Sequence, residues 1–192
     1  EGGMYILSTP LIPQCGSQID ACGICNGDNS SCTGCTNDTA YNYDIENIID
    51  DGLCIFYGDI NQDSNINVVD VVLMVEFIMD QATPDEDEFN LSDINNDGQI
   101  NVVDVVKVVE IILGDVLTRG KAANSASIYF GNGIAKIEAD GDIAGIEMKV
   151  SGDFTIIKTH LPIGWEISYN ESIILFFSID GSSLTGSELF EY

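Results

Sequence analysis

The sequence predicts a multidomain protein with a cysteine-rich irregular segment, a small helical domain of two loop–helix repeats, and an antiparallel β-sandwich. Three observations predict this fold class. All six cysteines lie near the N-terminus, one acidic phrase of twelve residues then occurs twice, and short alternating apolar runs follow from Ser127 onwards. The expected domains are residues 1–14, 15–57, 58–115, 116–126 and 127–192.

Residues 1–14 are expected to form an N-terminal extension. Residues 4–7 are an apolar run that could form a strand, and Pro10 and Pro13 keep it from continuing far. The extension is either a frayed tail or a strand donated to another sheet. No cleavable signal sequence opens the chain, and because its other features argue for export, Glu1 is expected to begin a mature, processed or partial product.

Residues 15–57 hold the cysteines and contain almost no long apolar run. Such a segment is typical of a loop-rich module that disulfides hold together because it lacks a core. A zinc site is the alternative, since the sequence has two Cys-x-x-Cys pairs, but only six residues separate them. A redox-active pair is less favoured because no basic group is present to lower a thiol pKa. The candidate disulfide residues are Cys15, Cys22, Cys25, Cys32, Cys35 and Cys54.

Two stretches of this segment resemble extracellular modules. Residues 20–32, Asp-Ala-Cys-Gly-Ile-Cys-Asn-Gly-Asp-Asn-Ser-Ser-Cys, are similar to the Cys-Gly-x-Cys-x-Gly-Asp segments of thrombospondin-like proteins. Residues 34–43, Gly-Cys-Thr-Asn-Asp-Thr-Ala-Tyr-Asn-Tyr, together with Asp-Asp-Gly-Leu-Cys at 50–54, resemble a short repeat of large secreted bacterial proteins. The second resemblance implies a bridge between Cys35 and Cys54. Both imply an exported spacer with no chemistry of its own.

The repeated phrase is Asp-Ile-Asn-Gln-Asp-Ser-Asn-Ile-Asn-Val-Val-Asp at 59–70 and Asp-Ile-Asn-Asn-Asp-Gly-Gln-Ile-Asn-Val-Val-Asp at 93–104. A twelve-residue loop can surround one calcium ion with oxygens from positions 1, 3, 5, 7, 9 and 12, position 7 acting through its carbonyl. Solvated turns are the alternative for Asp/Asn-rich runs, but two in-register copies argue against it. Two calcium ions are therefore predicted. The candidate ligands are Asp59, Asn61, Asp63, Asn65, Asn67, Asp70, Asp93, Asn95, Asp97, Gln99, Asn101 and Asp104.

Two further positions of each loop fit this interpretation. Gly98 stands where the loop must turn sharply, and Ser64 replaces it in the first copy, which costs strain if φ is positive there. Ile66 and Ile100 are expected to pin the loops to a core.

The apolar segments after the loops, residues 68–79 and 102–113, are predicted to be helices. They run directly out of the loops and stop at Asp80 and Gly114, which outweighs the low helix propensity of their β-branched residues. No helical pattern precedes either loop. Residues 81–92, which include a run of acidic residues, are expected to form a solvated connector.

Two loop–helix repeats without an entering helix resemble a dockerin domain, and residues 58–115 carry the resemblance. The resemblance implies a calcium-folded module that binds a cohesin domain in a bacterial surface assembly. At loop positions 10 and 11, where dockerins often carry polar residues that read the partner, this chain has Val68-Val69 and Val102-Val103. The expected partner is a cohesin-like surface protein or other copies of this chain.

Residues 116–126 are small and polar and are expected to form a linker. Beyond them, short apolar runs alternate with glycine-bearing turns, such as the one at residues 140–142, which is typical of an antiparallel sandwich. Residues 143–150 place Ile, Gly, Glu and Lys on one side, which predicts a strand with one solvated face. The expected strands are residues 128–130, 134–139, 143–150, 154–159, 165–169, 173–179 and 189–192.

The C-terminal region is similar to cohesin-like and immunoglobulin-like surface modules in its strand rhythm and in the progression from Ala144-Gly-Ile146 to Gly164-Trp165. Six or seven strands are fewer than such modules normally carry, so the sandwich is expected to be incomplete. An exposed sheet edge aggregates unless something covers it. If residues 4–7 add to the edge of a neighbouring molecule, head-to-tail addition produces a filament.

Charge argues against several classes of partner. The chain has six Lys plus Arg against 32 Asp plus Glu, for a formal net charge of −26. Nucleic-acid binding needs basic side chains to neutralise phosphates, and an acidic membrane surface would repel this chain. No stretch of about 20 apolar residues is present that could insert into a bilayer.

No enzyme is predicted. The chain lacks a Gly-x-Ser-x-Gly elbow, a metalloprotease motif and a phosphate loop, and its single histidine, His160, is expected to be packed or solvent-facing. The expected function is that of a secreted, calcium-stabilised structural protein, a subunit of an extracellular filament or surface assembly. The alternatives are a dockerin-type anchoring module that binds a cohesin-like partner, or a small carbohydrate-binding module. Sequons permit glycosylation at Asn29, Asn37, Asn90 and Asn170.

Overall fold

A computed structural model describes residues 18–114 and 121–192. The chain divides into two compact units, Glu1–Phe56 and Tyr57–Tyr192. The candidate donor strand at residues 4–7 and the candidate disulfide residue Cys15 lie outside the described residues. No helix in the described part is long and apolar enough to cross a membrane.

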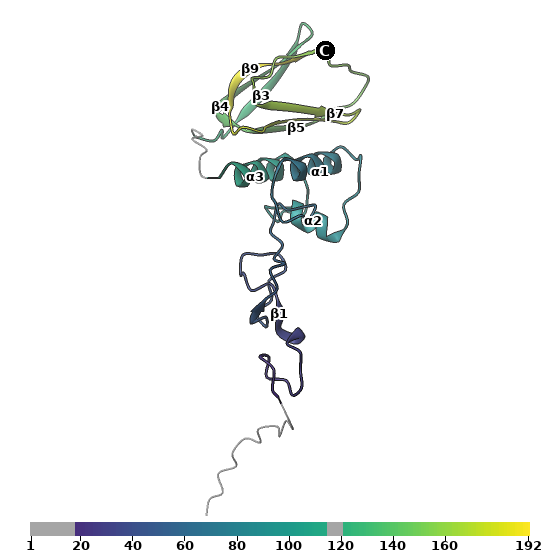
Figure 1. Cartoon of the computed structure of the whole chain (residues 1–192). Helices are drawn as coiled ribbons and strands as arrows, with labels where there is room; N and C mark the ends of the chain where they lie inside the picture. Colours follow the sequence, from purple (N-terminus) through teal and green to yellow (C-terminus); the bar gives the residue numbers. More distant parts are fainter. Residues whose placement is uncertain (1–17, 115–120) are drawn as a thin grey trace, which may run out of the picture. The chain divides into compact units, whose positions relative to one another are not determined.

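The first unit has little regular structure. It contains a 3-10 helix, η1 (Ser30–Cys32), and two short strands, β1 (Thr33–Gly34) and β2 (Ile49–Asp50), which pair in parallel (Figure 1). Among the described residues of this unit, the buried apolar ones are Cys32, Cys35 and Ala40. The cysteines therefore supply most of the interior of this unit, as expected for a segment without a core of its own.

Disulfides link Cys22 to Cys32 and Cys35 to Cys54, the second being the pair implied by the resemblance to secreted repeats. Cys25 is also disulfide-bonded, and no cysteine among the described residues is free. A zinc site needs thiolates, and every described cysteine is disulfide-bonded, which argues against zinc in this part of the chain. A redox-active Cys-x-x-Cys pair would bridge its own two cysteines, whereas Cys22 is bridged to Cys32 and Cys35 to Cys54.

In the second unit, α1 (Val68–Ile78) and α3 (Val102–Leu113) follow the two loops and contact each other. Both helices begin at an asparagine N-cap and bury residues three or four positions apart, such as Val71, Met74 and Ile78 in α1. The capping and the buried stripe outweigh the weak helix propensity of the valines. The predicted helices are therefore confirmed.

A third helix, α2 (Glu86–Ser92), lies where a solvated connector was expected. The prediction that no helix precedes the second loop is therefore wrong. The Oδ1 of Asp85 accepts the N–H of Glu88 at 2.8 Å, and the Oε2 of Glu88 accepts the N–H of Asp85 at 2.9 Å. Leu91 is fully buried. The acidic run is thus a capping box at a helix N-terminus, where negative charge is favourable.

Two antiparallel sheets follow. One has the order β3-β4-β9-β6 and the other β5-β8-β7. The strands are β3 (Ala126–Gly131), β4 (Ile134–Ile143), β5 (Gly145–Lys149), β6 (Lys158–Thr159), β7 (Trp165–Tyr169), β8 (Ile173–Ser178) and β9 (Leu184–Glu191). Both sheets contribute to one core, in which the rings of Phe176 on β8 and Phe190 on β9 stack at 5.9 Å. The predicted antiparallel sheets are present.

Only the strand at 165–169 has the predicted bounds, and the largest differences concern β4, β6 and β9. The prediction of a turn at residues 140–142 is wrong, because β4 continues through these residues. Backbone hydrogen bonds join Asp142 to Lys121 and Ala123. Of residues 154–159, only Lys158–Thr159 pair with β9. β9 begins at Leu184 rather than at residue 189.

Helices α1 and α3 lie against the sheet that contains β5 and β7, and α2 lies on their far side (Figure 1). Successive residues of a strand face opposite sides of a sheet, so Leu175 and Phe177 on β8 point away from the sandwich core, yet they are 0% and 6% exposed. Helix α3 contacts both β8 and β5. The prediction of a solvated face for residues 143–150 is therefore wrong at β5, because helix α3 covers that face.

Candidate metal centre

In the first loop, two buried aspartates hold the backbone in a closed turn. The carboxylate of Asp59 accepts the N–H groups of Asp63 at 3.1 Å and Ser64 at 3.0 Å. The carboxylate of Asp70 accepts those of Ile60 at 2.9 Å and Asn67 at 2.9 Å. Asp70 thus joins the start of the loop to the N-terminus of α1.

The second loop repeats this arrangement. The carboxylate of Asp93 accepts the N–H groups of Asp97 at 3.0 Å and Gly98 at 2.8 Å, and that of Asp104 accepts those of Asn95 at 3.2 Å and Asn101 at 3.1 Å. The duplicated sequence therefore gives a duplicated geometry, with the first and last aspartates of each loop aimed inward.

The glycine position of each loop has the expected backbone conformation. Gly98 has φ +83° and Ser64 has φ +69°. A Cβ placed on Gly98 would meet nothing within 4 Å, so the serine of the first loop fits sterically and carries only the cost of a left-handed backbone.

The carboxylates of each loop repel one another. Burial raises the pKa of Asp59, and the charges of Asp70 and Asp63 raise it further. Burial likewise raises the pKa of Asp104, with further contributions from Asp93 and Asp97. Positions 1, 5 and 12 of both loops are therefore close enough to feel each other's charge, and the chain has no Lys or Arg before Lys107.

A divalent cation fits this chemistry. The predicted donors are all carboxylate, amide or carbonyl oxygens, which suit a hard ion such as calcium. Among the described residues, no three or more His, Cys, Asp or Glu side chains converge as a ready-made metal cluster. The amide nitrogens of Asn61 and Asn95 donate to Asp63 and Asp97, at 3.1 Å and 3.0 Å. The complete set of twelve ligands therefore stays a prediction.

Position 9 has a structural role that the sequence reasoning missed. The side-chain oxygens of Asn67 and Asn101 accept the N–H groups of Val69 and Val103, each at 2.9 Å, and so cap α1 and α3. With the aspartate three residues later, each forms a capping box. The spacing Asn-x-x-Asp, which is visible in the sequence, would have indicated this.

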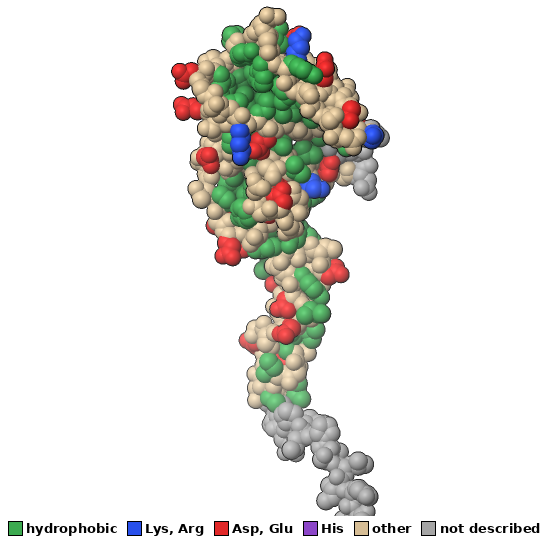
Figure 2. Space-filling view, turned by 180° about the vertical axis from the view of Figure 1, so that it is seen from behind, with side chains coloured by type: hydrophobic (Ala, Val, Ile, Leu, Met, Phe, Trp, Pro, Cys, Tyr) green, Lys and Arg blue, Asp and Glu red, His purple; other side chains and the backbone are tan. Residues whose placement is uncertain are grey.

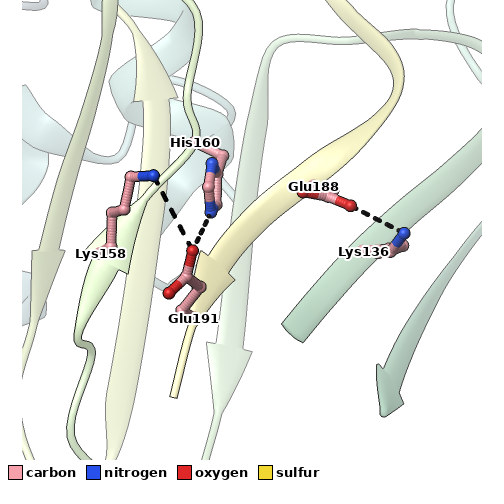
Figure 3. A network of polar contacts seen from close by, with 5 residues as sticks. All are labelled: Lys136, Lys158, His160, Glu188 and Glu191. Carbon is pink, nitrogen blue, oxygen red and sulfur yellow. Dashed lines mark hydrogen bonds and ion pairs between the residues drawn. The ribbon is translucent and has the colours of Figure 1, made fainter. Parts of the chain in front are cut away.

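The single histidine, His160, lies outside the loops and directly follows β6. It belongs to a polar network that joins strands β4, β6 and β9 (Figure 3). The Nε2 of His160 is 2.9 Å from the Oε1 of Glu191, and Lys158 is 3.9 Å from the same oxygen. Lys136 and Glu188 form a second pair at 2.8 Å, and the hydrogen bond and charge of Lys136 lower the pKa of Glu188. These contacts join neighbouring strands, and His160 is half-buried as part of the sheet.

The sequons differ in how their amides are used. Asn37 is exposed, and its Oδ1 accepts from the backbone and hydroxyl of Thr39. The Oδ1 of Asn29 accepts the N–H of Ala21, and Asn90 is half-buried in α2. The Nδ2 of Asn170 donates to the carbonyl of Met79 at 3.0 Å, a bond that a glycan on this nitrogen would disturb. Glycosylation at each of these residues stays a prediction.

The two capped helices and the acidic loops before them define a tandem loop–helix domain with oxygen donors suited to a hard ion. Residues 57–113 match the family model of the dockerin type I domain, which confirms the resemblance for this segment. Dockerin domains bind calcium and cohesins, and they occur on extracellular or cell-surface proteins. The comparisons with curated proteins and with solved structures found no match.

Proposed function

We propose that residues 57–113 are a calcium-stabilised anchoring module through which an exported, non-catalytic protein binds a cohesin-like partner. The match to the dockerin type I model supports this function most directly. Calcium binding is supported by the three carboxylates at positions 1, 5 and 12 of each loop, which lie close enough to repel one another.

The last aspartate of each loop would link a bound calcium ion to the helix that follows the loop. Asp70 and Asp104 accept backbone N–H groups from the start of their loop and from the N-cap of the following helix. A bound calcium ion would offset the buried negative charge of these carboxylates. Ion binding would therefore fix the N-terminal turns of α1 and α3, where loop positions 10 and 11 lie.

The test is isothermal titration calorimetry of the full chain with a purified type I cohesin domain, in calcium and in EGTA. Binding in calcium that EGTA abolishes is expected. The double variant Asp70→Asn, Asp104→Asn should lose binding, whereas Asp153→Asn, Glu171→Gln, which removes the same charge from exposed sandwich positions, should retain it. Absence of binding in calcium, or equal binding by both double variants, contradicts the proposal.

A filament subunit is a second candidate, supported by the edge of one sheet. Among the described residues, β3 pairs only with β4, so its other side offers unpaired backbone groups, and Tyr129 and Phe130 on it are exposed. Residues 4–7 would be the donated strand. Deleting residues 1–9 should leave soluble monomers, and filaments that persist in electron micrographs would rule this out. Introducing a negative charge by Val103→Glu should break an assembly that docks the calcium domain instead, and it should spare strand donation.

A carbohydrate-binding role is a third candidate, supported by an open cleft of about 760 Å³ at one end of the sandwich. The cleft is lined by Phe154, the half-exposed Tyr169, and the acids Asp153 and Glu171. Aromatic rings with polar groups around them suit sugar rings. Retention on insoluble polysaccharide that Tyr169→Ala removes is expected from this function, and no retention by the wild type would reject it.

A further inference from the structure

The two repeats have the same sequence at their helix N-termini but different surroundings. Val68 and Val72 of α1 correspond to Val102 and Val106 of α3. Val68 is 58% exposed and Val72 is 51% exposed, whereas Val102 is 9% exposed and Val106 is half-buried. One of two chemically equivalent apolar faces is therefore covered, and the other is open.

The sandwich covers the second repeat. A Cβ placed on Gly145 of β5 would lie 2.5 Å from Val102 and 2.9 Å from Val106, so only glycine permits this approach. The Oε2 of Glu147, also on β5, accepts the N–H of Val102 at 3.3 Å. At the far end of α1, the carbonyl of Met79 accepts the Nδ2 of Asn170. We call the surface made by Val102, Val106 and Met79 the closed face.

The duplication implies a matching surface made by the start of α1 and the end of α3. Ile111 and Ile112 at the end of α3 are 45% and 38% exposed, whereas their counterparts Phe77 and Ile78 in α1 are 8% and 7% exposed. Val69 and its counterpart Val103 are both about half-exposed. A Cβ on Gly58 would lie 3.4 Å from Ile66 of the first loop and 3.7 Å from Ile111, so the end of α3 lies beside the first loop. We call the surface made by Val68, Val69, Val72, Ile111 and Ile112 the open face.

We propose that the β-sandwich fills the closed face within the same chain, so that a partner binds only at the open face. This inference rests on the proposed function. In a domain with two equivalent faces a partner could bind in two orientations, whereas this chain permits one. The sandwich acts as a built-in partner for the second repeat and removes that choice.

The closed face also shows what kind of surface the open face fits. Its covering sheet offers a glycine opposite the valines and the apolar side chains Leu175 and Phe177 at its centre. The partner should therefore be a β-sheet face of another protein, apolar at its centre with a small residue opposite Val68 and Val72. Its rim should be basic, because the chain has no Lys or Arg before Lys107. The described surface of the first unit, taken by itself, likewise shows acidic and no basic side chains (Figure 2).

A second copy of this chain does not fit that description. Its corresponding sheet is already covered by its own α3. The outer side of its other sheet carries the Lys136–Glu188 and His160–Glu191 pairs, which an apolar face would have to desolvate (Figure 3). The occupant is therefore a different protein.

Binding of a purified type I cohesin domain, measured by calorimetry in calcium, tests the proposal. The variant Val68→Asp, Val72→Asp should weaken binding by about tenfold or more, because it places charges in an apolar contact. Val103→Asp, which places a single charge on the second repeat at the counterpart of Val69, should change the affinity less than about twofold. Open-face variants that bind like the wild type, or a Val103→Asp variant that fails to bind, overturn the proposal.

A second experiment displaces the sandwich from the closed face and asks whether that face can then bind the cohesin. Gly145→Val places a side chain where Val102 and Val106 now lie and should free the closed face, so that binding returns when it is combined with Val68→Asp, Val72→Asp. Gly186→Val is the matched control, since its Cβ would meet only the carbonyl of Ile137 at an ordinary 3.7 Å. No return of binding, in a Gly145→Val variant with released Leu175 and Phe177, overturns the proposal.

A measurement without any partner separates this inference from the proposed function. Hydroxyl-radical footprinting of the wild type in calcium should label Ile112 quickly and Leu175 and Phe177 slowly. Gly145→Val should speed the labelling of Leu175 and Phe177, and Gly186→Val should not. If the cohesin does not bind the wild type but this pattern holds, the proposed function fails and the filled closed face stands. Equal labelling of Ile112, Leu175 and Phe177 in the wild type overturns the inference itself.

Discussion

Replacing Asp104 with asparagine should destabilise the protein more in calcium than in EGTA. Asp104 is fully buried at the last position of the second loop, and its two oxygens accept the N–H groups of Asn95 and Asn101. An amide of the same shape keeps one acceptor and turns a donor toward the other N–H. It also removes one of the three carboxylates available to an ion in this loop.

Two effects determine the size of the change. In EGTA, one charge-assisted hydrogen bond is lost, which costs about 1.5–3 kcal/mol. This loss is partly offset, because burial raises the pKa of Asp104 and the neutral amide relieves the cost of a buried charge. In calcium, an ion bound about 100-fold more weakly removes about 2.7 kcal/mol of additional stabilisation. The free energy of unfolding should therefore fall by about 2–3 kcal/mol more in calcium than in EGTA.

Urea denaturation measures both free energies. Circular dichroism follows the helices, and the fluorescence of Trp165, the only tryptophan and a buried core residue, follows the sandwich. The exposed Glu171→Gln variant serves as the control for loss of one negative charge. Equal destabilisation by Asp104→Asn with and without calcium would refute the assignment of Asp104 as a ligand.

Three further changes have defined outcomes. Phe176→Ala removes a fully buried ring from the sandwich core and should lower the free energy of unfolding by about 3–5 kcal/mol, measured in urea; a loss below about 1 kcal/mol would contradict the core assignment. The variant Cys35→Ser, Cys54→Ser opens a bridge between residues 19 positions apart and should cost about 3 kcal/mol, seen as faster proteolysis of the first unit, with unchanged proteolysis as the contrary result. Hydrogen bonds from Ser125 and Asn124 lower the pKa of Asp140, so the stability that this carboxylate contributes is complete above its unfolded pKa and is lost as the pH falls through the lower folded value. An NMR titration should find the Asp140 pKa below its ordinary value of about 3.9, Asp140→Asn should remove this part of the pH dependence, and a value at or above the ordinary one would be inconsistent with these hydrogen bonds.

The loops and their helices could be predicted because their causes are local. Alternating oxygen donors define the loop, and the positive φ of Gly98 and Ser64 follows from the turn that such a loop needs. The spacing from Asn67 to Asp70 caps the helix that follows. Each of these features depends on residues within one turn or loop, so a repeated phrase is enough to reveal them.

The features that could not be predicted depend on residues far apart in the chain. Residues 140–142 have the composition of a turn, but backbone hydrogen bonds from residues 121–123 hold them in a strand. Gly145 and Glu147 alternate like solvated positions, and only the folded chain brings α3 over them. The acidic residues at 85–88 suit solvent, and the buried Leu91 that fixes α2 gives too short a pattern to be recognised.

Counting the bound ions tests the central claim most directly. Native mass spectrometry of the purified chain should find two calcium ions, with both lost in EGTA together with a lower melting temperature. The double variant Asp70→Asn, Asp104→Asn should hold neither ion at the same calcium concentration. A wild-type chain that carries no calcium and melts at the same temperature in EGTA would contradict a calcium-stabilised domain at residues 57–113.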